Sequence, residues 1–178
     1  MNQLKSLISD HNGTDPYDDV DQRAALRNFI LNDAPFRKYL IERFAITGAI
    51  ELCYDPLGLY KVDAGIKQDG KLIGLIEVDY YKQWDPDWPS NYKWCHALVR
   101  KIKYWKDNNL PYLACTFSAK GDKVLVSTDE MQMKYMHTKR KKLVVLKGEW
   151  VDDEFLEIPL KEAEKFGNWT ESELRRVS

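Results

Sequence analysis

Three carboxylates in the middle of the chain are the residues best placed to do chemistry. Asp63, Glu77 and Asp79 lie in segments that favour strands, and the last two interrupt an apolar run from Leu72 to Tyr81. Residues two apart on a strand share a face, so Glu77 and Asp79 point the same way. Charges within an apolar run are costly unless they are paired or bound to a metal. A divalent cation that prefers oxygen ligands, Mg²⁺ or Mn²⁺, would remove the repulsion between converging carboxylates.

The turn between the two strands decides whether these acids meet. If the D-G pair at 69–70 forms a two-residue turn, Asp63 and Glu77 fall on opposite faces of the hairpin. If residues 68–70 form a three-residue loop with a bulge, Asp63 shares a face with both other acids. The metal-site hypothesis therefore requires the second register or a compensating bulge.

Apolar periodicity and turn residues predict a mixed α/β chain with a central sheet. Helices are expected over about 21–32, from Pro35 to Thr47-Gly48, and over 91–107, where Trp94, Leu98, Ile102 and Trp105 recur at helical spacing. Strands are expected at 49–54, 58–67, 71–81, 111–119, 123–128 and 143–147. Residues 83–91 form a loop because they include two prolines. A last short helix is expected at 161–166 or 171–176.

Length and composition indicate one globular domain over residues 1–178. Hydrophobic residues make up 44% of the chain, which excludes a wholly disordered protein. No apolar run approaches the roughly 18–20 residues that cross a membrane, and the N-terminal segment lacks the apolar stretch of a signal peptide. We therefore expect a cytoplasmic protein. Three cysteines without a CxxC spacing predict neither a disulfide framework nor a cysteine-based zinc site.

The segment YKVDAGIKQDGKLIGLIEVDYYKQW at 60–84, with the expected helix and strand after it, resembles the PD-(D/E)XK nuclease superfamily. The resemblance implies the restriction-endonuclease-like fold, a central mixed β-sheet flanked by helices, with a nuclease-like core over 36–119. Residues 149–178 would follow as an acidic C-terminal extension. In that superfamily an Asp on one strand and a Glu or Asp on the next bind a divalent cation, and Asp63 and Glu77 match these positions.

The resemblance further implies metal-dependent hydrolysis of DNA phosphodiester bonds, with Mg²⁺ or Mn²⁺ held by Asp63, Glu77 and Asp79. Glu42, on the preceding helix, matches an additional metal-binding Glu of some members. Asp79 stands where the superfamily has a lysine that assists the attacking water. A lysine from elsewhere would have to replace it, and the candidates are Lys61, Lys82, Lys93 and Lys101. Of these, Lys82 and Lys93 are favoured.

Two basic segments without any acid, 93–106 and 131–148, are typical of phosphate-binding surfaces. The candidate nucleic-acid-binding residues are Lys93, Arg100, Lys103, Lys139, Arg140, Lys141 and Lys142. The net charge of −1 is therefore a cancellation between basic and acidic segments. Trp84, Trp88 and Tyr92 either stack on unpaired bases or cover a sheet edge. DNA is the expected partner, and many nucleases of this type form homodimers to cut both strands.

Two other interpretations stay open. Asp79 at the lysine position fits an inactive relative that acts as a nucleic-acid-binding or protein-interaction module. Alternatively, the hairpin acids belong to the solvent-exposed face of an unrelated α/β domain. The first of these, like the nuclease hypothesis, requires Asp63 and Glu77 to lie close together, whereas the second does not.

Overall fold

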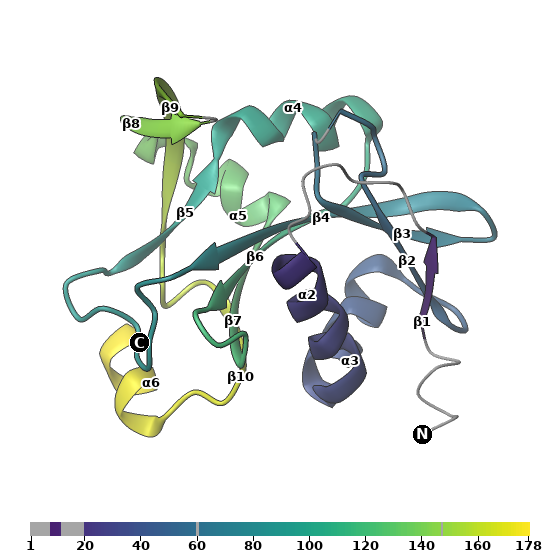
Figure 1. Cartoon of the computed structure of the whole chain (residues 1–178), viewed down its shortest axis with the longest axis horizontal. Coiled ribbons are helices and arrows are strands. Elements are labelled where there is room, and N and C mark those ends of the chain that lie inside the picture. Colours follow the sequence, from purple (N-terminus) through teal and green to yellow (C-terminus); the bar gives the residue numbers. More distant parts are fainter. Residues whose placement is uncertain (1–7, 12–19, 60, 147) are drawn as a thin grey trace.

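The computed structural model describes residues 8–11, 20–59, 61–146 and 148–178, which form an α/β fold around a central sheet (Figure 1). Seven described strands form this mixed sheet, in the spatial order β1 (Ile8–His11), β2 (Ile50–Tyr54), β3 (Ala64–Gln68), β4 (Lys71–Tyr81), β6 (Tyr112–Ser118), β7 (Lys123–Thr128) and β10 (Glu164–Gly167). Helices flank it on both faces. The predicted class, a central mixed sheet flanked by helices, is confirmed.

The central strand β4 has the predicted bounds, 71–81, and pairs antiparallel with β3 and parallel with β6. The strand expected at 58–67 begins later, at Ala64, because residues 55–59 and 61–63 form turns and bends before β3. Since β4 and β6 run in parallel, their carboxyl ends lie at the same edge of the sheet, where ligands bind in many α/β folds.

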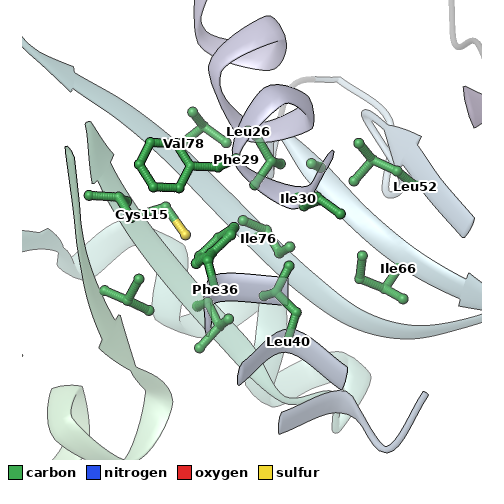
Figure 2. Packing of buried hydrophobic residues seen from close by; sticks show 14 of the residues in the cluster. Leu26, Phe29, Ile30, Phe36, Leu40, Leu52, Ile66, Ile76, Val78 and Cys115 are labelled. Atoms are coloured by element: carbon green, nitrogen blue, oxygen red, sulfur yellow. The ribbon is translucent and has the colours of Figure 1, made fainter. Parts of the chain in front are cut away.

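Helices α2 (Val20–Asn32) and α3 (Ala34–Phe44) cover one face of this sheet, as Figure 1 shows. Asp33 caps α3 by accepting a hydrogen bond from the backbone N–H of Phe36 at 2.8 Å. Both helices bury apolar side chains against the sheet, and Figure 2 labels Leu26, Phe29, Ile30, Phe36, Leu40, Leu52, Ile66, Ile76, Val78 and Cys115. The helices predicted from residue spacing in this region are therefore confirmed.

The opposite face is covered by helix α4 (Val99–Asn108) and by a three-stranded antiparallel sheet of β5 (Trp94–Leu98), β9 (Glu149–Pro159) and β8 (Arg140–Leu146). The prediction of a helix over 91–107 is wrong in its first half. Residues 94–98 are extended because they pair with β9, where Cys95 lies opposite Ile158. Cys95 and Ala97 thereby enter a second apolar core that also contains Trp105 of α4.

The last part of the chain joins both sheets. After α5 (Asp129–Lys134) and a 3₁₀ turn (Met136–Thr138), β8 and β9 form a hairpin, β10 pairs with β7, and α6 (Glu171–Val177) follows. Of the two alternatives for the last helix, 171–176 is correct, whereas 164–167 is a strand. The strand expected at 143–147 begins earlier, at Arg140. Among the described residues, no helix has the length and apolar character needed to cross a membrane.

Candidate active site

The hairpin of β3 and β4 closes with the two-residue turn. Asp69 and Gly70 both have positive φ values, 51° and 74°, and Gln68 pairs with Lys71 on either side of them. This backbone matches the right-handed twist of the strands, which is why D-G is favoured there. With regular pairing throughout, this turn would place Asp63 and Glu77 on opposite faces of the sheet.

A β-bulge in β4 reverses that outcome. The pairing slips by one residue between Ile66 and Lys67, which leaves Ile73 as an extra residue on β4. Beyond the bulge every pair is shifted by one, and Asp63 and Glu77 come to lie opposite each other on neighbouring chain segments. The structure therefore has the compensating bulge that the metal-site hypothesis requires.

Packing against helix α3 explains why the bulge forms at this position. Ile73 and Gly74 are consecutive, yet both face the core beneath α2 and α3. A Cβ atom on Gly74 would collide with the ring of Phe44, so only glycine permits the observed approach of α3 to the strand. The contact between Gly74 and Phe44 lies on one face of the sheet. The bulge beside it brings Asp63 and Glu77 together on the other face.

Asp63 and Glu77 form a largely buried pair of carboxyl groups within hydrogen-bonding reach of each other. The backbone N–H of Val78 donates to Asp63 Oδ2 at 2.8 Å. Burial and the Asp63 charge raise the pKa of Glu77 to about 8, against the opposing influence of Lys101. Burial also raises the pKa of Asp63, although the Val78 N–H and Lys101 act in the other direction. Both shifts favour one proton shared by the pair at neutral pH.

Lys101, from helix α4, is the lysine that reaches these acids. Its Nζ lies 2.9 Å from Glu77 Oε1 and donates to the backbone carbonyl of Lys61 at 2.7 Å. Only 6% of Lys101 is exposed, which is unusual for a lysine and requires such partners. The ammonium group thus stands beside Glu77 and comes from a helix that lies outside the β3–β4 hairpin.

The favoured lysines of the sequence prediction lie elsewhere. Lys82 and Lys93 are both exposed, in the turn after β4 and just before β5. The signal for Lys101 is its place on the apolar side of α4, next to Ile102 and four residues before Trp105. A lysine among buried positions of a helix is a better candidate than a lysine near the motif in sequence.

The acid pair has the chemistry of a site for a hard divalent cation. Glu77 Oε2 is buried and receives no hydrogen bond from any N–H or O–H group of the described residues. Its neighbour is the Asp63 carboxyl, and either a proton or a cation can relieve the repulsion there. Across the described ranges, no group of three or more His, Cys, Asp or Glu side chains converges on one point. The pair offers two carboxylates, the ligand type that Mg²⁺ and Mn²⁺ prefer, and water or substrate oxygens would have to complete the coordination of either ion.

The other two predicted metal ligands are not part of this pair. Asp79 lies two residues beyond Glu77 on the same face, close enough for its charge to raise the pKa of Asp63, but it is exposed and accepts from the Tyr80 N–H. Glu42 lies on α3, which covers the opposite face of the sheet. Its exposed carboxylate pairs with Lys38 at 3.8 Å, so Glu42 does not join the site.

Three of the seven predicted nucleic-acid-binding residues pair with acids of strand β9. Arg100 pairs with Asp153 at 3.4 Å, Lys139 with Glu154 at 3.3 Å, and Arg140 with Glu157 at 3.1 Å. The acidic segment therefore neutralises part of the basic one. Four exposed lysines make no ion pair with the described residues, namely Lys93, Lys103, Lys141 and Lys142.

The aromatic residues of the 83–91 loop and its flank divide between core and surface. Trp84 and Trp88 are buried, with 0% and 5% exposure, and cover the edge of the sheet. Tyr92 instead lines a groove of about 180 Å³ together with Tyr81, Trp94 and Asp79. Asp79 thus stands between the acid pair and this groove.

Comparison with solved structures gives a nuclease from a fusselovirus. It has a TM-score of 0.48 and 14% sequence identity, over 93% of this chain and 96% of that chain. No protein-family profile and no curated protein matches the sequence. At this TM-score the likeness assigns neither residues nor activity, so the functional assignment rests on the acid pair, Lys101 and their surroundings.

Proposed function

We propose that the protein is a metal-dependent nuclease that hydrolyses DNA phosphodiester bonds. The observation that carries this proposal is the placement of Asp63 opposite Glu77, with the Lys101 ammonium on the second acid. Largely buried carboxyl groups beside a buried lysine are typical of active sites, where such groups bind cations, transfer protons or stabilise charge. A core position without such a task would favour apolar residues.

Each residue has a role in the proposed reaction. Asp63 and Glu77 would hold Mg²⁺ or Mn²⁺, which supplies Lewis-acid polarisation and lowers the pKa of water. Binding of the cation would displace the proton shared by the two acids, so that both carboxylates are ionised. The Lys101 Nζ offsets negative charge on the phosphate. The oxygen of water bonds to phosphorus, one ester P–O bond breaks, and the products are a phosphate monoester and an alcohol.

Cleavage of labelled single-stranded, duplex and branched DNA with Mg²⁺ or Mn²⁺ tests this proposal. We expect Glu77→Gln to abolish cleavage and Lys101→Met to slow it on the order of 10²-fold, because each removes a charge next to the reacting phosphate. Matched controls are Glu42→Gln, an acid on the opposite face, and Lys106→Met, an exposed lysine of the same helix. Absence of cleavage by the wild-type protein on every substrate with either cation would refute the proposal.

A second candidate, a nuclease-fold module that binds nucleic acid without cleaving it, is favoured by one observation. Lys101 Nζ already occupies Glu77 Oε1, and an acid stands at the usual lysine position. In that case, DNA binding would be unaffected by either cation, and Glu77→Gln would bind DNA as the wild-type protein does.

A further inference from the structure

The groove beside Asp79 lies at the carboxyl ends of β4 and β6, next to the acid pair. Its volume of about 180 Å³ is below the roughly 300–1,000 Å³ of pockets for drug-sized ligands. We call it the aromatic groove and define it by Asp79, Tyr81, Tyr92, Trp94, His96 and Thr116. A planar ring system suits this size better than a base pair or a peptide.

One wall of the aromatic groove is held rigid before any ligand binds. The rings of Tyr81 and Tyr92 lie 6.1 Å apart at 72°, and the Tyr81 hydroxyl donates to Gln83 Oε1 at 2.9 Å. Burial and the adjacent Tyr92 raise the pKa of Tyr81 to about 12, so its hydroxyl stays a donor. Trp88 Nε1 donates to the backbone carbonyl of Tyr92 at 3.1 Å and so holds the main chain that carries the second ring. A prearranged wall loses little conformational entropy when a ring stacks on it.

The floor of the aromatic groove is rich in hydrogen-bond acceptors. Asp79 lies opposite Thr116 in the parallel pairing of β4 and β6, and both line the groove. Asp79 Oδ1 accepts from the Tyr80 N–H, and the second carboxylate oxygen has no partner among the described residues. A carboxylate repels a phosphate but accepts from an amino group. At the rim, the exposed Lys142 provides a positive charge without an ion pair in the described ranges.

We propose that the aromatic groove binds one unpaired nucleotide of a DNA strand, through a base that carries an exocyclic amino group. The base stacks on Tyr92, its amino group donates to Asp79, and Lys142 contacts the flanking phosphate. Cytosine, adenine and guanine carry such an amino group, whereas thymine does not. This inference rests on the proposed nuclease function and narrows it, because the bond cleaved would lie in a single-stranded or unpaired region.

Fluorescence anisotropy of labelled oligonucleotides in the presence of a chelator measures binding separately from cleavage. We expect oligo-dC to bind more tightly than oligo-dT, and both to bind more tightly than a duplex. Tyr92→Ala should weaken oligo-dC binding by about tenfold or more because a stacking ring is lost, while Tyr92→Phe retains it. Asp79→Ala should abolish the preference for oligo-dC over oligo-dT. The preference is measured as the ratio of the two dissociation constants, in which the general effect of removing a negative charge cancels. Trp150→Ala removes an exposed Trp at the start of β9 that does not line the aromatic groove, and it is the control.

Equal binding of oligo-dC and oligo-dT by the wild-type protein would overturn the inference, as would unchanged binding by a folded Tyr92→Ala variant. The proposed function would survive that result if the protein still cleaved DNA with Mg²⁺. Conversely, selective oligo-dC binding without cleavage under any of the cation conditions would refute the nuclease proposal and leave the aromatic groove as a nucleotide-binding site.

Discussion

Replacing Glu77 by Gln should stabilise the protein, and only at high pH. The pKa of Glu77 is about 8 in the folded protein and 4.5 in a model peptide. Because the folded state retains a proton that the unfolded state releases, the free energy of unfolding falls as pH rises from about 4.5 to about 8. Gln resembles the protonated side chain and does not titrate. The free energies of unfolding of the wild-type protein and of Glu77→Gln should therefore be similar at low pH and should diverge as the pH rises.

The expected divergence follows from the size of the shift. Each pH unit between the two pKa values costs roughly 1.4 kcal/mol. Between pH 5 and pH 8 the wild-type protein should thus lose about 3 kcal/mol relative to Glu77→Gln. The Glu77 side chain is only 12% exposed, so solvent screens this effect little.

Urea denaturation of both proteins at several pH values, without divalent cations, measures the difference directly. Other titrating groups contribute to both curves and largely cancel in the comparison. A variant that is less stable than the wild-type protein at pH 8 would refute the reasoning. That result would show an ionised Glu77 whose ion pair with Lys101 outweighs both burial and repulsion from Asp63.

Two further variants test features that position the site. Glu173→Gln should destabilise the protein by about 3 kcal/mol at neutral pH, because it leaves the buried Lys123 ammonium with only the more distant Asp87 carboxylate, at 3.7 Å; denaturation curves measure this. Gly74→Ala should cost about 1–3 kcal/mol through overpacking against Phe44, and a smaller residue at position 44 should recover part of that loss in a double-mutant cycle.

The sequence predicts the elements of the central sheet well because their signals are local. The D-G turn, the apolar run of β4 and the helical spacing around Phe36 each depend on neighbouring residues. The segment at 94–98 is different, since Trp94 and Leu98 fit a helical stripe equally well. Its conformation is decided by pairing with β9, about 60 residues away, and no local pattern reports that partner.

The two acids illustrate the same limit at the level of the site. Their identity can be predicted from the sequence, but their meeting depends on the bulge at Ile73, which follows from the contact between Gly74 and Phe44. A register that changes by one residue moves every following side chain to the other face. Tertiary packing therefore decides whether this hairpin carries a site at all.

Two pairs of glutamate and lysine in this chain show how the surroundings of a glutamate determine the direction in which its pKa shifts. Glu173 accepts hydrogen bonds from Lys123, the Trp84 indole and the Trp88 N–H, and these outweigh burial and hold its pKa below the ordinary value. That carboxylate is satisfied and fixes α6 to the sheet.

Glu77 accepts from a lysine as well, but its second oxygen is buried without a hydrogen-bond partner among the described residues, and burial together with the Asp63 charge raises its pKa. The same pairing of residue types thus gives a lowered pKa in one place and a raised pKa in the other. An unsatisfied buried carboxyl costs stability, so this pair is where the proposed cation would relieve an unfavourable contact, whereas Glu173 needs no such partner.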